Sequence, residues 1–215
     1  GMFARKVFLV EGPTEALALP VYLSNVGLNP TQAGIAITPV GGKGSLARWW
    51  RLFTAFDIPC YISFDNDRKD DPGGMKRADA LVAVGFQGDS SYFMQSEEME
   101  VEHTFTVFGN EFEPCMKRLF DPEYTMFENE ARDVHGLTSR DAKPLLARYV
   151  AESLEIDKYP DGYRKFRDLA ERVQALTLST ASMVATRNLS LSAQEQSPVG
   201  DFDTEQDEEF DDIPF

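Results

Sequence analysis

Short apolar runs alternate with amphipathic segments along the first half of the chain. The runs are rich in branched and aromatic residues and have the length of buried strands, which we expect at residues 5–10, 35–38 and 60–64. The segments that follow them repeat apolar residues at helical spacing and predict helices over 14–26, 45–56 (with Ser45 as N-cap) and 76–84. A weaker strand is predicted around 92–94. This alternation is typical of the right-handed crossovers that build a parallel sheet.

The second half of the chain has a different pattern. Residues 109–175 are predicted to be largely helical, with one break at Pro160-Asp161-Gly162. From about residue 186 the chain turns polar and then acidic, which is typical of disorder. We therefore predict an α/β fold, a mostly parallel sheet flanked by helices with an appended helical segment. The expected parts are a core over 1–108, a helical extension over 109–187 and a disordered acidic tail over 188–215.

Acidic residues follow two of the predicted strands. Glu11 and Gly12 come directly after the first strand, and Asp65 and Asp67 come after the third. Because the carboxyl ends of parallel strands meet at one edge of a sheet, we expect these carboxylates to lie close together. Crowded carboxylates repel one another unless a cation lies between them, and hard oxygen ligands suit Mg²⁺ or Mn²⁺. The pattern therefore predicts a metal site.

A glycine-rich loop, Gly41 to Ser45 with Lys43 at its centre, follows the second predicted strand. It is not a P-loop, because Ile37 occupies the position at which that motif needs its first glycine. Two interpretations stay open. The loop brings backbone amides or Lys43 to a phosphate, or it is a turn that caps the next helix.

The two acidic motifs together resemble the Toprim domain, the metal-binding catalytic module of topoisomerases, primases and several nucleases. Further features are similar to the Toprim domain of OLD-family (overcoming lysogenization defect) nucleases, in which it follows an ABC-type ATPase. These features are Glu15, four residues after Glu11, the segment from Glu100 to Phe105, and Lys143-Pro144. The resemblance covers residues 5 to about 150. It implies a Rossmann-like sheet and, as a partner, an N-terminal ATPase domain in the same polypeptide, of which this chain would be the C-terminal region.

The resemblance also implies a metal-dependent DNA endonuclease that uses two ions, Mg²⁺ or Mn²⁺. The implied ligands of one ion are Glu11, Asp65 and Asp67, and those of the other are Glu15, Glu100 and Glu102. Glu11 is also a candidate catalytic residue, and Lys143 is expected to stabilise the developing charge on the phosphate. Candidate contacts with the DNA backbone are Lys43, Arg68 and Lys69.

Several of these residues also have ordinary structural interpretations. Glu15 is equally well explained as a first-turn acid that the helix dipole favours. Glu100 and Glu102 fit a solvated acidic run, and Lys143 fits a residue that starts a helix.

The net charge of the chain is −15, but much of it is at one end. Nine acidic residues and no Lys or Arg follow Arg187, which leaves 27 acidic against 21 basic residues in the remainder. This balance argues against strong autonomous affinity for DNA, which bound metal ions or a partner domain would have to supply. No apolar run is long enough for a membrane span, so we expect a cytoplasmic protein with no membrane partner.

The last residues of the chain carry a second recognisable motif. Residues 207–215 resemble the acidic tip of bacterial single-stranded-DNA-binding proteins, which implies docking on a helicase or another receptor of that tip. The implied anchors are Ile213, Pro214 and Phe215. The other interpretation is an acidic solubilising tail. The leading hypothesis is therefore a DNA endonuclease, and the alternative is a non-catalytic interaction module that docks on DNA-repair enzymes through its tail.

Overall fold

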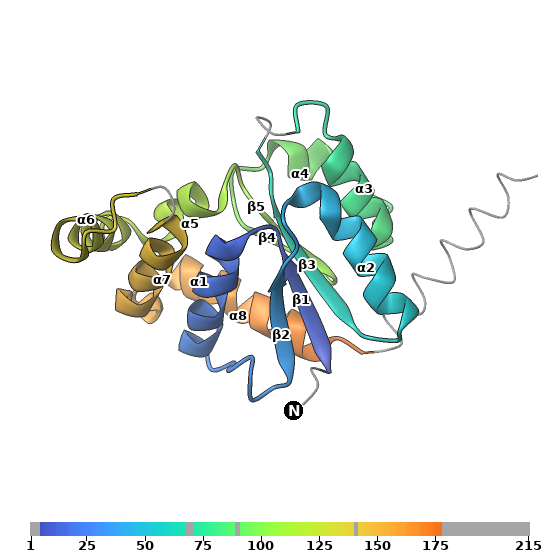
Figure 1. The fold of residues 1–215 in the computed structure, drawn as a ribbon, viewed down its shortest axis with the longest axis horizontal. Coiled ribbons are helices and arrows are strands. Elements are labelled where there is room, and N and C mark those ends of the chain that lie inside the picture. The colour runs from blue at the N-terminus through green and yellow to red at the C-terminus, as the bar shows by residue number, and fades with distance from the viewer. Residues whose placement is uncertain (1–4, 68–70, 89–90, 140–141, 178–215) are drawn as a thin grey trace, which may run out of the picture.

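The computed structural model describes residues 5–67, 71–88, 91–139 and 142–177. Within them the strands form one sheet in the order β2-β1-β3-β5-β4 (Figure 1). The four parallel strands are β1 (Lys6–Val10), β2 (Ile35–Pro39), β3 (Cys60–Asp65) and β5 (Phe105–Phe108), and the short β4 (Glu100–Val101) is antiparallel to β5. The predicted α/β fold with a mostly parallel sheet is thus confirmed.

Helices cover both faces of this sheet, which is why its strands read as nearly continuous apolar runs. In β1, Phe8 and Val10 face one core, and Val7 and Leu9 face the other. The second core lies under α2 (Leu46–Ala55), α3 (Met75–Ala83) and α4 (Ser91–Gln95) (Figure 1).

The first core is larger and includes residues from the second half of the chain. Its helices are α1 (Pro13–Asn25), α5 (Phe112–Phe120), α6 (Glu123–His135), α7 (Lys143–Ser153) and α8 (Pro160–Ala175), with a 3₁₀ turn over Ile156–Lys158. Tyr22 of α1 stacks against Phe120 of α5 and Phe166 of α8, with ring centroids 5.6 Å and 4.5 Å apart. The predicted helical extension therefore packs on the same face as α1. Among the described helices, none combines the length and apolar character that a membrane span requires.

Three local predictions were wrong. The strand expected around 92–94 is part of helix α4, and the fourth parallel strand is β5, at Phe105–Phe108. The predicted break at Pro160 is the start of α8, because proline lacks the N–H that the first helical turn leaves unused. Ser45 makes no capping hydrogen bond; a 3₁₀ turn over Lys43–Ser45 leads into α2 instead.

Candidate active site

The carboxyl edge of the parallel strands carries an open pocket of about 530 Å³. Glu11 follows β1, Asp65 ends β3, and Glu113 lies in the first turn of α5, shortly after β5. Glu15 lies in the first turn of α1, and Lys143 begins α7. All five side chains line this pocket. The structure thus brings together predicted residues from both halves of the chain and adds Glu113.

Glu11 and Asp65 are joined by a hydrogen bond between neighbouring strands. The backbone N–H of Asp65 donates to Oε1 of Glu11 at 2.7 Å. Burial raises the pKa of Glu11, although nearby Lys43 and this hydrogen bond act in the opposite direction. Burial, followed by the charges of Glu15, Glu11 and Glu113, raises the pKa of Asp65 well above its usual value. Oδ1 of Asp65 is buried and accepts no hydrogen bond, so this oxygen lacks a compensating donor.

Glu15 also lines the pocket and is buried. Burial raises its pKa to about 7, helped by the charges of Glu11 and Glu113. Close carboxylates raise each other's pKa in this way when no cation neutralises them. The pocket therefore concentrates negative charge that the surrounding protein only partly balances.

Lys143 is the cation at the rim of the pocket. Its Nζ lies 2.8 Å from Oε1 of Glu113, and its side chain is half exposed. Burial lowers the pKa of Lys143, but its close contact with the Glu113 carboxylate outweighs this and raises the pKa overall. Lys143 is therefore a charged and accessible group beside the carboxylates.

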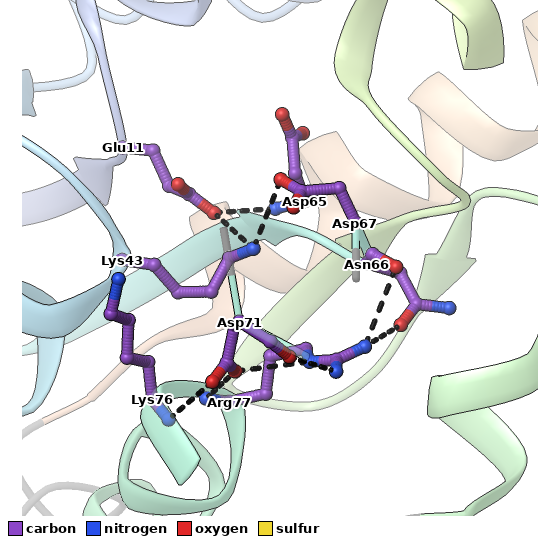
Figure 2. Close-up of polar contacts among 8 residues, drawn as sticks. All are labelled: Glu11, Lys43, Asp65, Asn66, Asp67, Asp71, Lys76 and Arg77. Atoms are coloured by element: carbon purple, nitrogen blue, oxygen red, sulfur yellow. Dashed lines mark hydrogen bonds and ion pairs between the residues drawn. The ribbon is translucent and has the colours of Figure 1, made fainter. Parts of the chain in front are cut away.

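Lys43 is not an exposed contact for a phosphate. Its side chain is only 4% exposed, and its Nζ lies 3.6 Å from Oε1 of Glu11 and 3.3 Å from Oδ2 of Asp67. Figure 2 shows the ammonium between these two carboxylates, whereas the Asp65 carboxylate points away from it. In this arrangement Lys43 is a buried counter-ion of Glu11 and Asp67.

A second cluster of charges lies next to this one and was not predicted. Arg77 is buried and donates from Nε to Oδ2 of Asp71 at 3.2 Å and from Nη1 to Oδ1 of Asn66 at 2.7 Å (Figure 2). The N–H groups of Lys76 and Arg77 also donate to the Asp71 carboxylate. Burial alone would raise the pKa of Asp71, but these hydrogen bonds and the guanidinium lower it. The cluster ties Asn66 and Asp71 to the first turn of α3.

Glu100 and Glu102 do not line the pocket. Glu100 accepts a hydrogen bond from Ser96 Oγ at 2.9 Å, and its Oε2 lies 3.7 Å from Nζ of Lys165. Glu102 follows β4, and its backbone oxygen accepts a hydrogen bond from the Tyr61 hydroxyl near the start of β3. Glu102 therefore lies toward the end of β3 that is opposite to Asp65. The other predicted site residues, Arg68, Lys69, Ile213, Pro214 and Phe215, lie outside the described residues.

The chemistry of the pocket suits a divalent cation, although its arrangement is not that of a finished metal site. In the part of the chain that the structure describes, no three His, Cys, Asp or Glu side chains are already grouped to hold a metal ion. The donors are nevertheless carboxylate oxygens, which Mg²⁺ and Mn²⁺ prefer. The buried Oδ1 of Asp65 has no hydrogen-bond donor, and a cation would compensate it. By this test the residues fit a hard divalent ion.

The residues that sequence reasoning missed had weak signals. Glu113 follows β5, and its position at the pocket edge follows only once Phe105–Phe108 is recognised as a parallel strand. Asp71 and Arg77 carry no motif, because their pairing depends on how Asp71 lies against the first turn of α3.

Comparison with known proteins supports the resemblance found in the sequence. Residues 2–67 match the family model of the overcoming lysogenization defect protein-like TOPRIM domain. The predicted likeness to the OLD-family Toprim domain is confirmed over that stretch. Glu11, Glu15, Asp65 and Asp67 lie within it, whereas Glu113 and Lys143 lie beyond it. No curated protein sequence matches the chain.

Similar solved structures are C-terminal regions of OLD proteins. For the Xanthomonas campestris pv. campestris protein, in the structure phased with mercury, the identity is 16% and the TM-score 0.47, covering 89% of this chain and 98% of that one. For the Burkholderia pseudomallei protein the identity is 18% and the TM-score 0.44, covering 87% and 99%.

Proposed function

We propose that this OLD-like Toprim chain is a metal-dependent endonuclease that cuts DNA with two divalent ions, Mg²⁺ or Mn²⁺. The observation that carries the proposal is the pocket in which Glu11, Glu15, Asp65 and Glu113 meet beside Lys143. Glu11, Glu15 and Asp65 are largely buried and have raised pKa values. Carboxylates of this kind destabilise a protein unless they bind something positive. Such an arrangement is typical of a functional site rather than of a structural one.

The carboxylates divide into two sets according to the elements that carry them. Glu11 follows β1, Asp65 ends β3 and Asp67 follows it, and these side chains would hold the first ion. Glu15 and Glu113, in the first turns of α1 and α5, would hold the second, in place of the expected Glu100 and Glu102. Bound ions of this kind polarise the phosphate, activate a water molecule and stabilise the leaving oxygen.

The residues of the chain itself position the carboxylates and supply a positive charge for the phosphate. The hydrogen bond from the Asp65 N–H fixes the Glu11 carboxylate relative to β3. Lys143 would place its ammonium against the charge that develops on the phosphate, where a fixed positive group is most effective in a site that excludes water. The body of the chain is acidic, so we propose that an N-terminal ATPase domain in the same polypeptide contributes DNA affinity.

The test is an assay on supercoiled plasmid with Mg²⁺, Mn²⁺ or Co²⁺ and no ATP. The wild-type chain is expected to nick and then linearise the plasmid slowly, whereas Glu11→Ala and Asp65→Asn should cut about 10²–10³-fold more slowly. Glu152→Gln is the matched control, because Glu152 pairs with Arg148 on the exposed face of α7, and it should cut at the wild-type rate. Natively folded wild-type chain that cuts with none of these metals would contradict the proposal and favour a non-catalytic interaction module.

A further inference from the structure

Lys43 carries a positive charge into the interior of the acidic edge. It lies 3.6 Å from Glu11 and 3.3 Å from Asp67, and almost none of its side chain is exposed. Lysine is rarely buried this deeply unless it is paired, because removing an ammonium group from water is costly. The two carboxylates it pairs with are those that the proposed function assigns to one metal ion.

The glycine loop fixes Lys43 at this position. Gly41 and Gly42 adopt φ values of 77° and 111°, which other residues rarely adopt. Their turn allows the N–H of Gly42 to donate to the backbone oxygen of Glu11 at 2.8 Å. The backbone of Lys43 is therefore held beside Glu11, and its long side chain reaches past Glu11 to Asp67 (Figure 2).

We propose that Lys43 is the resident cation of the metal-free site, and that a divalent ion binds Glu11 and Asp67 in competition with its ammonium group. The inference rests on the proposed function, since it concerns the same carboxylates. It also accounts for the lack of a ready three-carboxylate group among the described residues, because the ammonium lies where two of the carboxylates would converge.

Charge and space together support this competition. An ammonium group and a divalent ion that share two carboxylates repel each other strongly at such distances. The four-carbon stem of lysine is flexible, and a pocket of about 210 Å³ adjoins Lys43, lined by Glu11, Gly42, Lys43 and Lys76. The ammonium has room to withdraw into this pocket, where it would meet a DNA phosphate in the role that the sequence predicted for Lys43.

Calorimetric titration of Mn²⁺ tests the inference on the full chain. Lys43→Met removes the competing charge but keeps a side chain of similar length, so the Kd for Mn²⁺ should fall about tenfold or more. Lys76→Met is the matched control, because it removes one charge from the adjoining pocket without vacating the gap between Glu11 and Asp67. Its Kd should stay within about threefold of the wild type. An unchanged or higher Kd in Lys43→Met, with the control near the wild type, would overturn the inference.

The second measurement uses the wild-type chain and does not depend on how the variants fold. An amine-reactive acetylating reagent labels lysines according to their exposure, and mass spectrometry reads each site. Saturating Mn²⁺ should accelerate labelling of Lys43 severalfold, while labelling of Lys158, whose side chain is half exposed, stays constant. Labelling of Lys43 that is unchanged or slower with Mn²⁺ would overturn the inference.

The two proposals fail in different ways. If the wild type binds Mn²⁺ and cuts DNA but Lys43→Met gains no affinity, only the role of Lys43 is wrong. If neither the wild type nor Lys43→Met binds Mn²⁺, both proposals are wrong. If the wild type fails to bind Mn²⁺ but Lys43→Met binds it, the competition is stronger than proposed and the inference is supported.

Discussion

Two neighbouring clusters of buried charge lie near the carboxyl end of β3, and they differ in how completely their charges are compensated. Around Arg77, the Asp71 carboxylate receives donors from the guanidinium and from two backbone N–H groups, and its pKa is lowered. In the pocket, Asp65 has a buried oxygen without a donor, and its pKa is raised. The first cluster is complete without a ligand. The second is not, which separates a structural cluster from a candidate binding site only a few residues away.

The largest expected effect tests the complete cluster. Arg77→Met leaves Asp71 as a buried charge that has lost its guanidinium, so the free energy of unfolding should fall by about 3–5 kcal/mol. Urea denaturation followed by circular dichroism measures this change. Arg51→Met is the control, because Arg51 and Asp79 form a pair whose side chains are 54% and 50% exposed, and its loss should cost at most about 1 kcal/mol. Equal losses in the two variants would remove the distinction between the clusters.

An intermediate effect is expected at the rim of the pocket. Lys143→Met should reduce plasmid cleavage by about 10²-fold, because the ammonium acts on the charge of the transition state. The Kd for Mn²⁺ should change little, since lysine is not a metal ligand. Lys117→Met is the control; Lys117 pairs with Glu128 and does not line the pocket. Cleavage by Lys143→Met at the wild-type rate would make Lys143 a helix-start residue only.

The smallest effect concerns stability in the pocket. Asp65→Asn removes a buried and poorly compensated charge, so the metal-free melting temperature should stay equal or rise by a few degrees. Saturating Mn²⁺ should stabilise the wild type by about 2–3 kcal/mol and the variant much less, since Asp65 would be a ligand. Differential scanning calorimetry with and without metal checks both expectations. A clear loss of metal-free stability in Asp65→Asn would show that this cluster, too, is complete without a ligand.

The sequence predicted those parts of the fold whose signal is local. Strands β1, β2 and β3 are apolar on both faces, and the acids that follow β1 and β3 are visible without any tertiary information. Strand β5 has only four residues and was missed, whereas the apolar residues around Phe93 in α4 were taken for a strand. Tertiary packing determines both elements. Because β5 was missed, Glu113, which follows it, was not predicted as a site residue.

The site residues predicted from the family resemblance do not all line the pocket. Glu15 and Lys143 line the pocket, whereas Glu100 and Glu102 do not. Lys43 was associated with phosphate from its glycine loop alone, because nothing local indicates that its side chain would point inward between two carboxylates. A motif identifies the loop, but the direction of a long side chain follows from the charges that the rest of the fold brings near it.

The aromatic stack around Tyr22 determines how far this chain can be shortened. Tyr22 belongs to α1, in the segment that the family model matches, but its ring partners Phe120 and Phe166 come from α5 and α8. A chain cut after β5 would retain the strand-end acids but expose this ring and the rest of its apolar surface to water. A stable fragment is therefore expected to extend through α8, and a fragment that ends after the sheet is expected to aggregate.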